Sequence, residues 1–515
     1  MVMWLLASEA WLELTASERR MYHQRACRVR AALSPPNYSN MANILEQIEY
    51  KYPVEQITVN GEQVWPYLRI WYYGAHRTKT VGLHGEAKYE SQASTRSRPG
   101  RIIRFAASTL RSLRYGFRNW FRRYDYIVLA GSRAPKKVGG GYMNPLLDPI
   151  IAEIGPTRSL CVRPASYFGR EGMKQIYTRH VVSWSLVTLF SLTIILLRRM
   201  FFRRHKVTNG WLLDRIAADF GLNIDAAVMI ENCEAERKAF TWLFRMIRPR
   251  AVLLTCYYGK EPAIRAAKSL GIKVIEVQHG VIGREHPAYN VHREMDRSCF
   301  PDHLLVFGSR ELETFDNSRF IDPANVHPVG SYYIDYIRDN YSPEPQLRDQ
   351  LSGYKRVVGV TLQWTSEKRL IAFVCEAAKL DMSIMYMLIP RQPEKEEYSN
   401  MVLPRNVAVI RDKSFYELMA YCDFHSTVNS TCALEAPALG VQNVLIDLDG
   451  MARAYYEKIL SDERVTRFAE TAEEYVEIVR TFTRLDREAV CRLHEGFFAS
   501  NYQENVRSFV KTYLP

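Results

Sequence analysis

The chain has 515 residues, 47% apolar and 24% charged, a composition that excludes a disordered or fibrous protein and allows two or three domains with their own cores. It carries 69 Lys and Arg against 56 Asp and Glu. The formal charge of +13 favours an anionic partner: a nucleic acid, an acidic membrane surface or a phosphorylated substrate. The nine cysteines form no Cys-x-x-Cys pair, so neither a zinc site nor a disulfide framework is indicated, and reduced thiols in the cytoplasm are expected.

Residues 1–95 are predicted to form an α/β or α+β lead-in, with a hairpin over residues 56–65 that turns at Asn60-Gly61. Its first residues lack the basic and long apolar regions of a secretory signal, so we expect an uncleaved cytoplasmic chain.

Residues 96–123 contain nine arginines and no acid, and apolar residues recur there at spacings of three and four. This pattern predicts a basic amphipathic helix. Such a helix suits the interface of an anionic bilayer, or it packs on the core with a solvated basic face. Nucleic-acid binding is disfavoured because no motif of a nucleic-acid reader is present. On the membrane interpretation, the contacting residues are Arg104, Arg111, Arg114, Arg118 and Trp120.

Residues 181–197 form a second membrane candidate, because they are seventeen uncharged residues followed closely by basic ones. Seventeen residues is the lower limit for a helix that spans a bilayer. Since α/β-type sequence lies on both sides, a buried helix, or one that dips into one leaflet, is favoured over a transmembrane span. The chain is thus expected to be peripheral or monotopic at the inner face of the cell membrane.

The remaining elements alternate between strands and helices, which is typical of doubly wound parallel sheets. The first alternation falls within residues 96–335, and a polar stretch at 335–354 is a plausible linker. A second alternation covers residues 355–450, and residues 451–515 are predicted to be mostly helical. The predicted fold class is α/β, with two Rossmann-like domains facing a cleft and a C-terminal helical segment. The predicted strands are 126–130, 160–163, 251–256, 273–277, 303–307, 326–330, 357–362, 383–389, 407–410, 424–428 and 443–446. The predicted helices are 210–220, 234–247, 261–270, 367–380, 414–421 and 431–439.

The strand at 273–277 runs into Gln278-His279-Gly280, so it delivers an imidazole to a loop. Open α/β sheets bind ligands at the carboxyl ends of their strands. A lone histidine can instead satisfy its hydrogen bonds at a strand end. Similar polar residues in the second half favour a functional His279 at a cleft between the domains.

In the second half, Ser430 and Thr431 begin a helix after a strand, where hydroxyls and backbone N–H groups form a phosphate site or a simple N-cap. Glu435, one turn later, has a carboxylate suited to ribose hydroxyls. Arg391 follows another strand and suits a diphosphate, although a surface turn explains it equally well. Gln363 and Lys413 complete the set of polar strand ends. Neither a Walker loop nor Gly-x-Gly-x-x-Gly after a strand is present.

Residues 274–282, with His286 and Tyr289 beyond them, resemble the Gln-His-Gly segment of GT-B glycosyltransferases that build bacterial capsule and lipopolysaccharide. Residues 301–308 and 329–335 look like the segments that follow it. Residues 434–444 are similar to the Leu-Glu-Ala-x-Ala-Leu-Gly-x-Pro-Val-Val element of these enzymes, with Gln442-Asn443 replacing the usual proline. Pro390-Arg391-Gln392-Pro393 stands where transferases with CMP-linked donors commonly have His-Pro.

The resemblance implies a GT-B fold with the donor nucleotide in the C-terminal domain, the acceptor in the N-terminal one, and neither metal nor cofactor. His279 is then a general base if the reaction inverts the anomeric centre, or a clamp on the donor; Glu261 or Glu276 is a nucleophile if it retains. The candidate donor-binding residues are Gln363, Arg391, Lys413, Ser430, Thr431 and Glu435. The candidate acceptor and cleft residues are Gln278, Gly280, Tyr289 and Tyr257.

The expected function is transfer of a sugar from a nucleotide sugar to a growing, lipid-linked surface polysaccharide at the cytoplasmic membrane face. Expected partners are the nucleotide sugar, the glycan acceptor and an anionic membrane, with no nucleic acid. Two alternatives share the GT-B plan: a polyol-phosphate transferase of the teichoic-acid type, and a catalytically inactive scaffold or glycan-binding protein.

Overall fold

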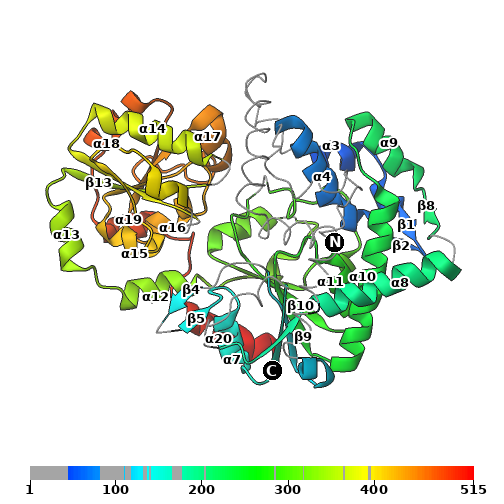
Figure 1. The fold of residues 1–515 in the computed structure, drawn as a ribbon. Coiled ribbons are helices and arrows are strands. Elements are labelled where there is room, and N and C mark those ends of the chain that lie inside the picture. The colour runs from blue at the N-terminus through cyan, green and yellow to red at the C-terminus, as the bar shows by residue number, and fades with distance from the viewer. Residues whose placement is uncertain are drawn as a thin grey trace.

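The computed structural model describes residues 44–81, 110, 117–131, 136–138, 141–164, 177–201, 205–283, 286–316, 318–363, 366–391 and 396–514. Two parallel β-sheets, each covered by helices on both faces, dominate this part of the chain (Figure 1). The predicted fold class, α/β with two Rossmann-like domains, is confirmed by these sheets.

The first sheet has seven parallel strands in the order β12-β11-β10-β9-β3-β6-β7. The chain builds β3, β6 and β7 outward on one side, then returns to add β9 to β12 on the other side of β3. The order therefore reverses between β3 and β9, where doubly wound sheets leave a crevice for ligands. The strands are β3 (Tyr126–Leu129), β6 (Ser159–Arg163), β7 (His180–Ser183), β9 (Ala251–Thr255), β10 (Lys273–Val277), β11 (His303–Val306) and β12 (Val326–Pro328).

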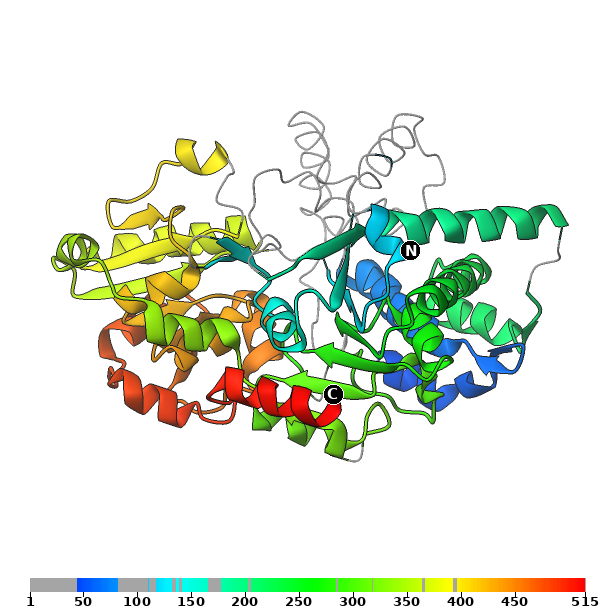
Figure 2. The same cartoon turned by 90° about the horizontal axis from the view of Figure 1, so that it is seen from below.

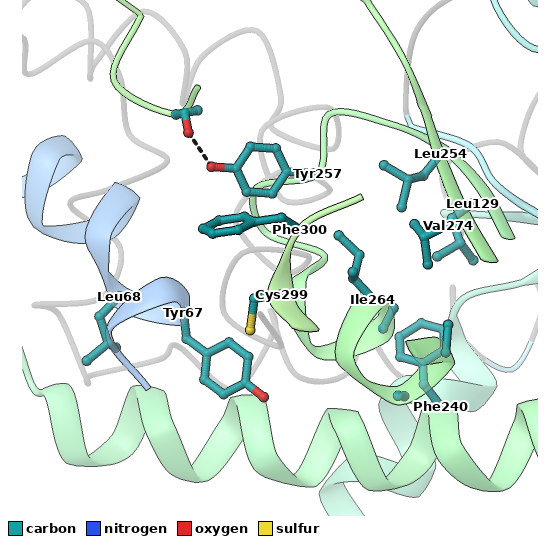
Figure 3. Packing of buried hydrophobic residues seen from close by; sticks show 14 of the residues in the cluster. Tyr67, Leu68, Leu129, Phe240, Leu254, Tyr257, Ile264, Val274, Cys299 and Phe300 are labelled. Carbon is teal, nitrogen blue, oxygen red and sulfur yellow. Dashed lines mark hydrogen bonds between the residues drawn. The ribbon is translucent and has the colours of Figure 1, made fainter. Parts of the chain in front are cut away.

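Helices bury both faces of this sheet, which explains why its strands are continuous apolar runs. Leu254 and Val274 pack in one core, shown with Phe240 of α10 in Figure 3, whereas their neighbours Leu253 and Ile275 pack in another core on the opposite face. The principal helices of this domain are α4 (Trp65–Val81), α7 (Asp148–Ile154), α8 (Ser185–Phe201), α9 (Trp211–Phe220), α10 (Ala226–Ile247) and α11 (Glu261–Lys268). Helix α3 (Ile44–Lys51) and an antiparallel sheet of β1 (Thr58–Val59), β2 (Glu62–Gln63) and β8 (Val207–Thr208) complete it.

The second sheet has six parallel strands in the order β15-β14-β13-β16-β17-β18, which again reverses beside its first strand. Its strands are β13 (Arg356–Thr361), β14 (Ile384–Ile389), β15 (Val407–Val409), β16 (Phe424–Ser426), β17 (Gln442–Ile446) and β18 (Thr466–Ala469). Its helices include α14 (Glu367–Leu380), α15 (Phe415–Leu418), α16 (Cys432–Ala438), α17 (Met451–Tyr456), α18 (Ala472–Thr481) and α19 (Arg487–Leu493).

The predicted strands and the hairpin at Asn60-Gly61 are confirmed, and three other segments differ from the prediction. Residues 335–354, expected to be a linker, do join the two domains, but they lie largely in the helices α12 (Tyr332–Asn340) and α13 (Pro345–Leu351) instead of an irregular segment. Strand β18 falls in the region predicted to be mostly helical. An unpredicted antiparallel hairpin is formed by β4 (Lys136–Val138) and β5 (Gly141–Met143).

The last helix, α20 (Tyr502–Tyr513), returns to the first domain. Its residues Tyr502, Val506 and Phe509 share a core with Leu253 and Ile275 of the first sheet. Figure 2 shows this helix lying below the first sheet. The two domains are therefore joined both by α12–α13 and by the chain that leads to α20.

The structure changes one of the membrane predictions and leaves others open. Trp120 is 1% exposed in the core of the first domain, so its ring does not reach a lipid surface and its assignment to the membrane is wrong. Arg118 is exposed, whereas Arg104, Arg111 and Arg114 lie outside the described residues. Residues 181–197 form β7 and most of α8. Within the described ranges, no helix combines the length and apolar character needed to cross a bilayer.

Candidate functional site

A small, partly open pocket lies between the two domains. The loop after β10 contributes His279 and Gly280, and the segment around α16 contributes Thr431 and Glu435. These four residues were predicted from the sequence, and the structure brings them together because both sheets direct the carboxyl ends of their strands toward the pocket. The rest of the lining is Lys136, Pro145, Leu146, Val281, Phe307, Ser331, Tyr333, Tyr416, Leu434 and Phe498.

His279 is half-buried, and Tyr258 holds its ring from the neighbouring strand end. The Tyr258 hydroxyl and His279 Nε2 are 3.2 Å apart, a hydrogen-bond distance. Tyr258 reaches this position through a tight turn after β9, in which Cys256 has φ +62° and Gly259 has φ +79°. A left-handed cysteine costs about 1 kcal/mol, so the surrounding structure must impose this turn. Lys260 helps by donating hydrogen bonds from Nζ to the carbonyl oxygens of Thr255 and Cys256, at 2.7 and 2.8 Å.

A buried polar layer lies beneath this loop and does not reach the pocket. Glu276 is fully buried, and its Oε1 accepts hydrogen bonds from the Tyr289 hydroxyl at 2.8 Å and from the backbone N–H of Tyr257 at 3.0 Å. The Tyr257 side chain points into the core beside Phe300, where its hydroxyl donates to the carbonyl of Ala288 (Figure 3). Tyr257 and Tyr289 are therefore core residues, and their assignment to the cleft is wrong.

Gln278 is fully buried too, and its side-chain amide forms hydrogen bonds with three other residues. Its Nε2 donates to the Gly280 carbonyl and to Glu311 Oε1, both at 2.9 Å, and its Oε1 accepts from the N–H of Phe307. Gln278 thus orients the loop that carries His279, and it has no surface left for a substrate.

The two carboxylates proposed as nucleophiles are inaccessible. Glu261 is 3% exposed and Glu276 is 0% exposed, and neither lines the pocket. Burial raises the pKa of Glu261 to about 8 and that of Glu276 to about 7, because a dry environment disfavours the charged carboxylate. Their position in the core contradicts the prediction that either attacks an anomeric carbon.

On the opposite wall, Glu435 is held by an aromatic neighbour. Its Oε1 accepts a hydrogen bond from the Tyr416 hydroxyl at 2.8 Å, and the residue is 9% exposed. Thr431 begins the turn before α16 and lines the pocket. Ser430 does not line it, because its Oγ accepts from the N–H of Cys432 at 3.3 Å and its carbonyl accepts from Tyr456. For Ser430 the structure therefore favours a capping role over phosphate binding.

The other three candidate donor residues lie on the second domain but outside the pocket. Arg391 Nη1 donates to Gln363 Oε1 at 3.3 Å, so adjacent parallel strands bring these two together as expected. Lys413 Nζ pairs with Glu344 Oε1 at 2.6 Å, which raises the pKa of Lys413. None of the three side chains lines the space between His279 and Glu435.

Lys136 is the main pocket residue that the sequence reasoning missed. Its Nζ lies 5.2 Å from the centre of the Tyr416 ring and 5.9 Å from that of Tyr333, within the range of cation–π contacts. It belongs to the β4–β5 hairpin, whose Val138 and Met143 are buried in a core made mostly by the second domain. A hairpin from the first domain thus places a cation against the second.

Comparisons with known proteins give structural similarity alone. No family model matches the chain, and no curated protein matches it. The glycosyltransferase of kitacinnamycin is 14% identical, with 76% of this chain and 100% of that chain covered and a TM-score of 0.46. The calicheamicin glycosyltransferase CalG4 is 15% identical, with 76% and 98% covered and a TM-score of 0.44. The UDP-GlcNAc 2-epimerase from Neisseria meningitidis bound to UDP-GlcNAc is 13% identical, with 76% and 99% covered and a TM-score of 0.43. Since these likenesses are weak, the fold class rests on the strand order of the two sheets.

Proposed function

We propose that this chain is a glycosyltransferase that moves a sugar from a nucleotide-sugar donor to a hydroxyl group of a glycan acceptor. The observation that carries the proposal is that His279 and Glu435 line the same pocket, His279 from the loop after β10 of the first domain and Glu435 from α16 of the second. Two-substrate transfer needs such an arrangement, because a base on the acceptor must meet the donor in a space that excludes bulk water.

The donor is proposed to bind on the second-domain wall. The Glu435 carboxylate is placed to accept hydrogen bonds from ribose hydroxyls, and Thr431 offers a hydroxyl beside it. Lys136 supplies a positive charge at the same pocket. A departing nucleoside phosphate gains negative charge, which a positioned ammonium group stabilises.

The acceptor is proposed to bind on the first-domain wall, with His279 as the general base. A base needs access to the hydroxyl group and a fixed ring orientation, and the contact between the Tyr258 hydroxyl and His279 Nε2 fixes the ring. The burial of Glu261 and Glu276 supports inversion of the anomeric centre, because retention through either carboxylate requires direct contact with the sugar. The metal-independent reaction expected from the sequence stays a prediction.

A growing, lipid-linked surface polysaccharide is the acceptor that we propose. Support comes from the sequence resemblance around His279 and Glu435 and from the chain's positive charge of +13, which suits a lipid diphosphate and the anionic surface that carries it.

The test is binding and turnover of CMP-, UDP-, GDP- and dTDP-sugars. One donor is expected to raise the melting temperature and to be consumed slowly in water. His279→Ala is expected to lower turnover by about 10²- to 10⁴-fold and keep donor binding, whereas Glu435→Ala weakens donor binding. Glu488→Gln, an exposed change on α19, is the control. NMR of the product should show an inverted anomeric carbon; a nucleotide sugar epimerised without any acceptor would contradict the proposal.

A further inference from the structure

Helix α8 exposes an apolar face to solvent. Leu189, Leu196 and Met200 follow at spacings of seven and four residues, so they share one side of the helix, and Leu197 lies beside them. Their exposed fractions are 37%, 59%, 64% and 48% in the order named. A folded chain rarely leaves so large a contiguous apolar surface uncovered unless the surface binds something.

Some hydroxyl-bearing residues of α8 lie on its buried side. Ser191 is 3% exposed and donates its hydroxyl to the carbonyl of Val187 at 2.8 Å, within the helix itself. Thr188, at 1% exposure, donates to the carbonyl of Trp184. Hydroxyls bonded within the helix tolerate burial, so α8 packs on α10 through this side together with Val187, while Leu189, Leu196 and Leu197 stay exposed.

Helix α10 extends the apolar face with an aromatic side chain and surrounds it with basic ones. Trp242 is 43% exposed, and its ring centre lies 4.9 Å from that of Phe190 on α8. Lys238 and Arg245, at −4 and +3 from Trp242, are exposed on the same side of α10. Arg199 adds a third exposed cation and pairs with Glu231 at 3.4 Å.

We propose that this surface, the α8 patch, docks on the headgroup–acyl boundary of an anionic bilayer. The α8 patch consists of Leu189, Leu196, Leu197 and Met200 of α8 with Trp242 of α10, and its basic rim of Arg199, Lys238 and Arg245. Leucine, methionine and tryptophan suit the shallow apolar layer of a leaflet, and the rim suits its negative headgroups.

Charge favours a bilayer over a second copy of this chain as the occupant. A two-fold dimer through the α8 patch would bring the basic rims of both copies together, which costs free energy. Figures 1 and 2 show α8 at the edge of the first domain, on the side away from the second domain. A bilayer on this edge therefore leaves the second domain uncovered.

The α8 patch gives the membrane interpretation of residues 181–197 a definite geometry. Residues 181–197 neither cross a bilayer nor bury themselves completely, because α8 has one face in the core and one in solvent. This inference rests on exposure and charge at α8 and α10, and it holds even if the proposed transferase activity fails.

The experiment is flotation of the purified full chain with vesicles of phosphatidylcholine containing or lacking phosphatidylglycerol. Wild type is expected to float with anionic vesicles at low salt and to dissociate as salt rises. Leu196→Asp with Met200→Asp is expected to lower the partition coefficient at least about tenfold, because two apolar side chains lose their burial. Lys238→Glu with Arg245→Glu is expected to remove the preference for anionic lipid.

The matched control is Val402→Asp, which also replaces an exposed apolar residue with aspartate; Val402 lies on the second domain, outside the α8 patch, and is 99% exposed. It is expected to float like wild type. Flotation of the Leu196→Asp, Met200→Asp protein at the wild-type level would overturn the proposal. The proposal would also be overturned if light scattering showed that wild type is a dimer and that the Leu196→Asp, Met200→Asp protein is a monomer. Unchanged donor binding and melting temperature in the variants separate loss of docking from loss of fold or activity.

Discussion

The first domain holds two groups of ionisable residues a few residues apart in sequence, and only one of them reaches the pocket. His279, whose ring contacts Tyr258, forms part of the pocket wall, whereas Glu261, Glu276 and the rings around them form a buried floor. The pKa values of both floor carboxyls are raised by burial, a feature that by itself points to an active site. Burial argues against that assignment: these carboxyls lie in a dry core and do not line the pocket, whereas His279 lines it and is the base that we propose.

The largest effect is expected from His279→Ala, which should change turnover but not stability. Loss of a general base lowers turnover by about 10²- to 10⁴-fold and leaves the unfolding transition unchanged, because the side chain is half-buried at a loop. Steady-state transfer with the donor identified by the binding panel measures the first effect, and urea unfolding measures the second. Wild-type turnover in the variant would exclude His279 from the chemistry.

Glu276→Ala, a change in the buried floor, is expected to lower stability but to leave turnover nearly unchanged. Removing this carboxylate leaves the N–H of Tyr257 and the hydroxyl of Tyr289 without their acceptor, so the free energy of unfolding falls by about 1–3 kcal/mol per group. Turnover per folded molecule is expected to stay within a few-fold of wild type. The measurement is urea unfolding alongside active-site titration; a stable but inactive protein would contradict the assignment of Glu276 to the floor.

Lys136→Met tests whether the ammonium group beside the second domain binds the phosphate of the donor. Loss of a charge-assisted contact to phosphate is expected to weaken binding of the nucleotide sugar by about tenfold and to leave binding of the bare nucleoside unchanged. Calorimetric titration with both ligands measures the difference. Lys137→Met, the neighbouring lysine of the same hairpin, is the matched control. Equal losses for the nucleoside and the nucleotide sugar would show that Lys136 supports the hairpin alone.

The smallest effect is a pH dependence of stability that comes from the floor. Burial raises the pKa of Glu261 from 4.5 to about 8, so the folded chain keeps a proton that the unfolded chain loses between these values. Glu261 therefore makes stability fall as pH rises through this window and level off above pH 8. Between pH 5 and pH 8, the free energy of unfolding is expected to fall less in Glu261→Gln than in wild type, by about 1 kcal/mol or more. Identical slopes in both proteins would contradict a protonated Glu261.

The strands of both sheets could be predicted from the sequence, because strands that are buried on both faces are continuous apolar runs. It was not sufficient to separate Tyr257 from Tyr258. The two residues are chemically identical neighbours, and the left-handed turn at Cys256 sends one ring into the core and the other to His279. Nothing in the local pattern specifies that turn.

Long-range contacts explain the other differences between prediction and structure. Val138 and Met143 anchor the β4–β5 hairpin on residues some two hundred or more positions away, and this packing places Lys136 in the pocket. Likewise, the polar composition of residues 335–354 predicts a linker. The segment does join the domains, but Tyr333, Ile334 and Ile337 of α12 pack on the second domain and make its first part helical.

Chemical rescue tests the central claim, that His279 acts as a base in the pocket it shares with Glu435. His279→Ala removes an imidazole from a pocket wall, so added imidazole is expected to restore part of the turnover, and to do so more as its neutral fraction rises with pH. Glu435→Ala is expected to show no rescue. Equal responses of the two variants to imidazole, or transfer by His279→Ala that needs no rescue, would contradict the account.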